Sequence, residues 1–325
     1  MSMSRHHTVR AQGLNFDVVE QGKGPLVLLC HGFPETSHAW RHQLPALAQA
    51  GYRAAAPDLR GFGGSDCPAS EEAYGLLELI GDLVGMVDAL GEQQAVLVGN
   101  DWGGTLAWQA ARLRPDRFRA VASLGVPLMS RSPLLPSQVF PWTDDTWFYV
   151  HYFLEHGLAD HDLQANVELS LRKIYFAASG DAGPRNEPTT PNPFGLVSRK
   201  QAFLNTLPTP AELPSWLAPE DMHVFVKAFS RTGFTGGLNY YRNLDRNWRC
   251  EAAFDGLRVE VPALYMVGER DTGLAIPGMK DIIQAMPSLA PQLRGSHVIP
   301  KAGHWLPQEA PDAVNAALLG FLRSL

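Results

Sequence analysis

An aspartate lies where the sequence predicts an abrupt change from a buried strand to a helix. Residues 95–99 read Ala-Val-Leu-Val-Gly, which is typical of a strand buried on both faces, and residues 104–114 predict a helix. Between them, Gly-Asn-Asp-Trp-Gly-Gly places glycines on both sides of Asp101, as needed where a strand and a helix cross closely. A role in capping the helix alone does not need those glycines. Because a carboxylate can attack an electrophilic carbon directly, we predict Asp101 as a nucleophile that forms a covalent ester.

An ester on Asp101 is released only if a base activates water and a second group orients that base. His304, in Ala-Gly-His-Trp, follows the last predicted strand, and Asp271, in Gly-Glu-Arg-Asp, follows the strand before it. Since the carboxyl ends of parallel strands meet at one edge of a sheet, both side chains are expected near Asp101. We predict His304 as the base and Asp271 as the acid that orients it. Glu269 is the alternative orienting acid.

Predicted strands and helices alternate on both sides of a different middle region. Apolar runs predict buried strands, and periodic patterns between them predict helices. The strands are expected at 25–30, 53–57, 95–99, 120–125, 261–268 and 297–300, and the helices at 40–50, 76–90, 104–114 and 311–325. This alternation predicts an α/β fold with a mostly parallel sheet and helices on both faces.

The alternation stops near Pro127 and resumes after about Trp248. The region between is rich in aromatic residues and proline, with helical patterns and no clear strand. Residues 219–231 have good helix start and stop residues, whereas 184–195 contains four prolines and predicts an irregular loop. We therefore expect a helical insertion of roughly a hundred residues above the carboxyl ends of the strands, where open α/β sheets bind ligands.

Three stretches together resemble those of the epoxide hydrolases of the α/β-hydrolase fold. They are His-Gly-Phe-Pro-Glu at 31–35, Gly-Asn-Asp-Trp-Gly-Gly at 99–104 and Gly-His-Trp at 303–305. The resemblance covers nearly the whole chain, and the helical insertion matches the inserted cap, or lid, domain of that family. It implies a core domain over 1–128 and 246–325 and a helical cap domain over 129–245.

Two backbone N–H groups are expected to hold the oxyanion that forms during ester hydrolysis. In this fold one comes from the loop after the first buried strand, and the other from the residue after the nucleophile. At these positions the chain has Phe33 and Trp102. His31, in the same loop, is interpreted as a residue that holds the loop and not as the catalytic base.

The resemblance also implies a pair of catalytic tyrosines in the cap. Residues 234–243 are similar to the family's second-tyrosine motif and indicate Tyr241. Residues 147–153, Trp-Phe-Tyr-Val-His-Tyr-Phe, are similar to the stretch that holds the other tyrosine. Its register favours Tyr149, with Tyr152 as the alternative. Opening an epoxide places negative charge on its oxygen, and two phenols can stabilise that charge and donate a proton.

Composition limits the partners and the compartment. The chain of 325 residues has a net charge of −6, which gives no basic surface for nucleic acid, and no apolar run of membrane-spanning length. Its three cysteines have no metal-type spacing and are expected to be free thiols. We predict a cytoplasmic enzyme with no cofactor, no metal and no membrane partner. A homo-oligomer is compatible with the sequence.

The expected substrates are water and an apolar or aromatic epoxide, because the insertion is rich in aromatic side chains. The candidate cap-lining residues are Trp142, Trp147, Phe148, Phe153 and Phe194, and Tyr152 and Trp305 are further substrate-binding candidates. The product is a vicinal diol, and detoxification is one of several roles that fit. Two alternatives stay open at this point: a haloalkane dehalogenase, and a non-catalytic ligand-binding protein of the same fold.

Overall fold

The computed structural model describes residues 4–184, 192 and 194–325. In this part of the chain the strands form an eight-stranded sheet and a separate two-stranded sheet. The strands of the large sheet are β1 (Arg5–Ala11), β2 (Leu14–Gly22), β3 (Leu26–Cys30), β4 (Arg53–Pro57), β5 (Ala95–Asn100), β6 (Phe118–Leu124), β9 (Ala263–Gly268) and β10 (Leu293–Ile299). The predicted loop at 184–195 falls mostly on residues 185–191 and 193, which lie outside the described residues.

The large sheet is mostly parallel, as predicted. Its strand order is β1-β2-β4-β3-β5-β6-β9-β10. β1–β2 and β2–β4 pair antiparallel, and the remaining neighbours pair parallel. Since β3 lies between β4 and β5, the chain turns from one side of the sheet to the other at this point, which is where such sheets bind ligands.

The register brings the predicted loops together in pairs. Cys30 at the end of β3 pairs with Gly99 on β5, so the loop at 31–35 and the turn holding Asp101 leave the sheet side by side. Ile299 at the end of β10 pairs with Gly268 at the end of β9, so the loops that follow these strands also leave together.

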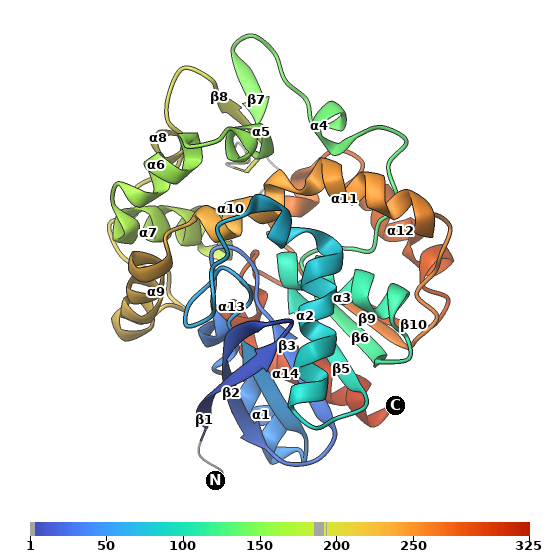
Figure 1. Cartoon of the computed structure of the whole chain (residues 1–325). Helices are drawn as coiled ribbons and strands as arrows, with labels where there is room; N and C mark the ends of the chain where they lie inside the picture. Colours follow the sequence, from blue (N-terminus) through green and yellow to red (C-terminus); the bar gives the residue numbers. More distant parts are fainter. Residues whose placement is uncertain (1–3, 185–191, 193) are drawn as a thin grey trace.

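Helices cover both faces of the sheet (Figure 1). The helical segments are η1 (Ser37–Trp40), α1 (Gln43–Gln49), η2 (Glu71–Tyr74), α2 (Leu76–Ala89), α3 (Trp102–Leu113), α4 (Pro136–Val139), α5 (Tyr149–Leu154), α6 (Leu158–Gln164), α7 (Val167–Ala178), η3 (Gly180–Ala182), α8 (Phe203–Thr206), α9 (Pro219–Thr232), α10 (Thr235–Arg242), α11 (Leu244–Glu251), η4 (Ala252–Phe254), η5 (Thr272–Ala275), α12 (Met279–Leu289), α13 (Leu306–Glu309) and α14 (Pro311–Arg323).

Alternate residues of each strand enter two separate cores. On β3, Leu28 and Cys30 pack in the core beneath α2 and α3, whereas Val27 and Leu29 pack in the core beneath α1 and α14. This is why the central strands are apolar on both faces. The first core continues into the insertion, so the insertion and the sheet share one apolar cluster.

The chain between β6 and β9 forms the layer over the carboxyl ends of the strands (Figure 1). It contains α4 to α11, and α9 begins at Pro219 with acidic residues in its first turn, as the sequence predicts. The sequence predicted no clear strand in this region. β7 (Thr146–Phe148) and β8 (Leu196–Ser198) pair antiparallel into a small sheet. Strands of three residues are too short to leave a recognisable alternation.

Among the described residues, no helix is both long and apolar enough to cross a membrane.

Candidate active site

Asp101 occupies a strained turn between β5 and α3. Its φ is 52° and its ψ is −120°, a backbone conformation that residues other than glycine rarely adopt. The glycines around it permit the close crossing that the sequence indicated. A Cβ on Gly103 would lie 2.0 Å from the Cys30 carbonyl oxygen, and a Cβ on Gly32 would lie 2.4 Å from Cβ of Asp101. The strained backbone and the closely packed glycines therefore fix the position of the Asp101 side chain at the edge of the sheet.

The two oxygens of the Asp101 carboxylate have different partners. Oδ1 accepts a hydrogen bond from the Phe33 backbone N–H at 2.8 Å. Oδ2 lies 3.3 Å from Nε2 of His304. One oxygen is thus held by a predicted oxyanion donor, while the other faces the predicted base. The second predicted donor, the N–H of Trp102, belongs to the residue that begins α3 directly after Asp101.

His304 lies between two carboxylates. Its Nδ1 is 3.0 Å from Oδ2 of Asp271, which is buried, whereas Glu269 accepts from the Lys301 backbone N–H at 2.9 Å instead. Of the two acids considered, the structure brings Asp271 to the histidine. Burial alone would lower the pKa of His304, but the charges of Asp271 and Asp101 outweigh it and raise that pKa well above its ordinary value.

Tyr149 and Tyr241 come from different helices and meet above Asp101. Their ring centroids are 6.3 Å apart, with an angle of 77° between the ring planes. Burial and the negative charge of Asp101 raise the pKa of both phenols, so both stay protonated at neutral pH. The ring of Trp102 packs edge-on against Tyr241 at 5.1 Å.

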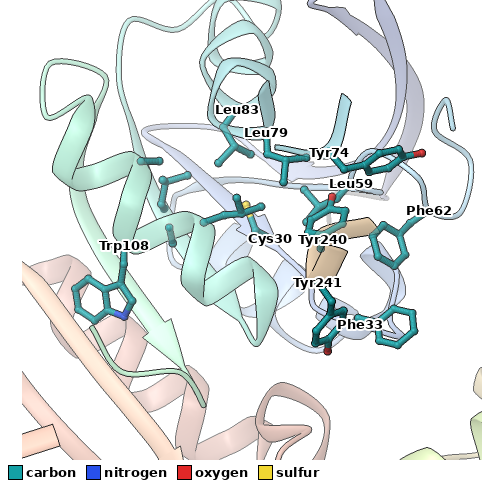
Figure 2. Packing of buried hydrophobic residues seen from close by; sticks show 14 of the residues in the cluster. Cys30, Phe33, Leu59, Phe62, Tyr74, Leu79, Leu83, Trp108, Tyr240 and Tyr241 are labelled. Carbon is teal, nitrogen blue, oxygen red and sulfur yellow. The ribbon is translucent and has the colours of Figure 1, made fainter. Parts of the chain in front are cut away.

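Neighbouring tyrosines on α10 point in opposite directions (Figure 2). Tyr240 is directed into the core, where its hydroxyl donates to the Arg60 carbonyl oxygen at 3.0 Å. Tyr241 is directed toward Phe33, with ring centroids 5.8 Å apart. The core contact of Tyr240 therefore fixes the rotation of α10 that turns Tyr241 toward Asp101.

Tyr152, the alternative to Tyr149, points elsewhere. Its hydroxyl donates to the Asp162 carboxylate at 3.1 Å, within the insertion. Both tyrosines lie on α5, but the structure places Tyr149 beside Tyr241 and Tyr152 beside Trp147.

The remaining substrate-binding candidates occupy different surroundings. Phe153 packs against Tyr149 and Tyr241, with ring centroids 5.4 and 5.1 Å away. Phe194 also contacts Tyr149, and Phe148 lies between Phe140 and Tyr149. Trp305 is buried beside His304, and Trp147 packs on His151 and Tyr152. Trp142 is 62% exposed.

Glu35 is a buried acid next to the site. No role was predicted for it from the sequence. It accepts hydrogen bonds from Asn100, Gln308 and the Gly32 backbone N–H. Burial raises the pKa of Glu35 to about 7. Its place in the loop at 31–35 was visible in the sequence, but its burial depends on α13, which is distant in the chain. His31 accepts from the Leu59 backbone N–H at 3.0 Å, in keeping with its predicted role of holding the loop.

Comparisons with known proteins identify the family of the chain. The model of the α/β-hydrolase fold family matches residues 25–311. Epoxide hydrolase A of Mycobacterium tuberculosis is 40% identical over 100% of this chain and 99% of its own length. Epoxide hydrolase 1 of Siraitia grosvenorii is 39% identical over 99% of both chains. The solved structure of an epoxide hydrolase from an endophytic Streptomyces has a TM-score of 0.92 and 41% identity, covering 99% of this chain and 96% of that one.

The fold and the carboxylate–histidine site define a hydrolase of the α/β type. The chain belongs to the α/β-hydrolase fold family and, within it, to the epoxide hydrolases. The fold, the family and the enzyme class predicted from the sequence are therefore confirmed.

Proposed function

We propose that this enzyme converts an epoxide into a vicinal diol through a covalent hydroxyalkyl ester on Asp101. The observation that supports this route most strongly is the arrangement around one carboxylate. Asp101 faces His304 through Oδ2 and the Phe33 N–H through Oδ1, with two protonated phenols nearby. A nucleophile, a base and charge-stabilising donors thus lie within one small space.

In the first step Tyr149 and Tyr241 bind the epoxide oxygen. Asp101 Oδ2 attacks a ring carbon from the opposite side, the carbon–oxygen bond breaks, and a phenol gives its proton to the new alkoxide. The raised pKa of each phenol keeps it in the protonated, donating form. Oδ1 stays on the Phe33 N–H and becomes the ester carbonyl oxygen.

In the second step neutral His304 takes a proton from water, which attacks the ester carbonyl carbon. The Phe33 and Trp102 N–H groups hold the oxyanion, and the proton on His304 passes to the departing diol. The proton of the Asp101 acid formed in this step returns to the phenolate left by the first step, which restores the starting enzyme. Ester formation removes the charge of Asp101, one of the causes that raise the pKa of His304. The histidine therefore becomes easier to deprotonate at the step in which it must act as a base.

The substrate class that we propose is an apolar or aromatic epoxide. The phenols are surrounded by the rings of Phe33, Phe153, Phe194 and Trp102. Such surfaces favour apolar groups and offer edge-to-face contacts to an aromatic substituent. Water is the second substrate.

The direct test is turnover of racemic styrene oxide by the wild type beside Asp101→Asn and Tyr241→Phe. The proposal expects diol from the wild type, none from Asp101→Asn and a slowed rate from Tyr241→Phe. If several epoxides of different size give no diol, the proposal is wrong. A halide-release assay with a chloroalkane then distinguishes a dehalogenase from a ligand-binding protein.

A further inference from the structure

Glu309 is a largely buried carboxylate that touches none of the reacting groups but contacts both residues that flank His304. Oε2 accepts from the Gly303 backbone N–H at 2.8 Å, and Oε1 accepts from the Trp305 backbone N–H at 2.9 Å. Oε2 also accepts from the Gly180 backbone N–H at 2.8 Å. One side chain at the end of α13 therefore joins the loop of His304 to the segment that follows α7 in the insertion.

The loop of His304 rests directly on the end of α7. The backbone N–H of His304 donates to the carbonyl of Ala178, the last residue of that helix, at 2.9 Å. The last carbonyls of a helix have no partner within the helix, so this contact also satisfies one of them. A Cβ on Gly303 would lie 2.3 Å from the Gly180 backbone nitrogen, which shows how closely the two segments approach.

A second contact joins the same segment to the loop of Asp271. The Arg270 side chain donates to the Gly180 carbonyl oxygen at 2.8 Å, and its backbone N–H donates to the Ala302 carbonyl oxygen at 2.8 Å. The loops that hold His304 and Asp271 are thus linked both to each other and to the residue after α7.

We propose that Glu309 is the positioning residue that holds His304 between Asp271 and Asp101. The imidazole has to lie 3.0 Å from one carboxylate and 3.3 Å from the other, although it is carried by a loop. A displacement of about 1 Å at such a site slows catalysis strongly. By binding the N–H groups on both sides of His304, Glu309 limits rotation of the backbone from which the ring projects.

This role rests on the proposed two-step function and affects its steps unequally. Ester formation uses Asp101 and the two phenols, whereas ester breakdown needs His304 as a base. Loss of the Glu309 contacts should therefore slow breakdown and leave formation almost unchanged. A side chain needed only for general folding would slow both steps together.

The experiment measures both steps by rapid mixing with styrene oxide in Glu309→Gln and Glu309→Asp. Glu309→Gln keeps the length of the side chain but replaces one acceptor oxygen with an NH₂ group that faces an N–H donor. Glu309→Asp keeps both oxygens but is shorter by one methylene group. We expect breakdown to slow about 10-fold, as for other residues that orient a reacting group, and formation to stay within about two-fold. The steady-state fraction of enzyme present as ester then rises.

A pH profile provides an independent readout. If His304 is less firmly held, Asp271 raises its pKa less. The midpoint of the pH dependence of ester breakdown should therefore shift to lower pH in both Glu309 variants. A purely structural defect would lower the rate without moving this midpoint.

Two reference variants separate the outcomes. His304→Gln reports whether the ester exists, so its failure to accumulate ester argues against the two-step function itself. Asp66→Asn removes a carboxylate that accepts from the Asn15 backbone N–H at 2.8 Å, far along the chain from these loops, and should change neither step. If His304→Gln accumulates ester but the Glu309 variants slow both steps equally, or neither, the positioning role is wrong. Glu309→Asp decides the question if Glu309→Gln does not fold.

Discussion

The imidazole Nε2 of His304 lies 3.3 Å from the carboxylate oxygen Oδ2 of Asp101, and this carboxylate influences the charge of the imidazole. While Asp101 is ionised, it helps to keep His304 protonated. Once Asp101 is esterified, that influence is gone. The same contact can therefore favour an ion pair in the free enzyme and a neutral base in the ester.

The first prediction separates the two tyrosines of α5. Tyr149→Phe should lower turnover about 10- to 100-fold, because it removes one of two donors to the developing alkoxide. Tyr152→Phe loses the hydrogen bond to Asp162, away from the phenol pair, so its turnover should stay close to wild type while its stability falls by about 1 kcal/mol. Steady-state kinetics and denaturant unfolding measure both effects. A larger loss of activity in Tyr152→Phe would reverse the assignment.

The second prediction concerns how pH changes the two chemical steps. Ester breakdown needs neutral His304, so its rate should rise as pH increases through the pKa of that histidine in the ester. Formation depends on protonated phenols, whose raised pKa keeps them protonated across the neutral range. The fraction of enzyme present as ester during turnover should therefore be highest at low pH. Rapid quenching followed by intact mass analysis measures it, and an ester fraction that grows with pH would contradict the scheme.

The third prediction concerns stability. His304 has a raised pKa in the folded protein, so its charged interaction with Asp271 stabilises the fold fully below its unfolded pKa of about 6.5. That contribution is lost as pH rises through the higher folded pKa. The difference in unfolding free energy between wild type and Asp271→Asn, about 2 kcal/mol at low pH, should therefore shrink as pH rises. A difference that grows with pH would show that the sign is wrong.

The fourth prediction compares two glycines. Gly32→Ala would place a Cβ 2.4 Å from Cβ of Asp101, so it should abolish most activity by displacing the nucleophile. Gly320→Ala is the matched control, since a Cβ there has no atom within 4 Å and lies inside α14. It should raise stability by about 0.5–1 kcal/mol without changing turnover. Near-normal activity in Gly32→Ala would mean that the loop moves away from Asp101.

The sequence could place the candidate residues together because each follows a stretch that it predicts as a strand, although β10 is largely exposed and begins at Leu293 and not at His297. Asp101 follows β5, Asp271 follows β9 and His304 follows β10, and parallel strands bring such positions to one edge. The sequence alone could not decide between Asp271 and Glu269. The two acids are two residues apart in one loop, so either side chain could turn toward the histidine.

The insertion was harder to predict. Tyr149 and Tyr241 were found only through family resemblance, because the periodicity of a helix does not show where it packs on a sheet. The burial of Glu35 depends on Gln308 of α13, and Glu309 joins the loop of His304 to Gly180 after α7, so each of these contacts links residues far apart in the chain. Contacts of that kind leave no local pattern.

The central claim is that Asp101 becomes covalently attached to the substrate. The most direct measurement is the intact mass of His304→Gln after mixing with styrene oxide, followed by mapping of the modified peptide. We expect the mass to rise by that of the epoxide, with the adduct on Asp101. If the wild type forms diol from the same epoxide while His304→Gln remains unmodified, or if the adduct lies on another residue, the account is contradicted.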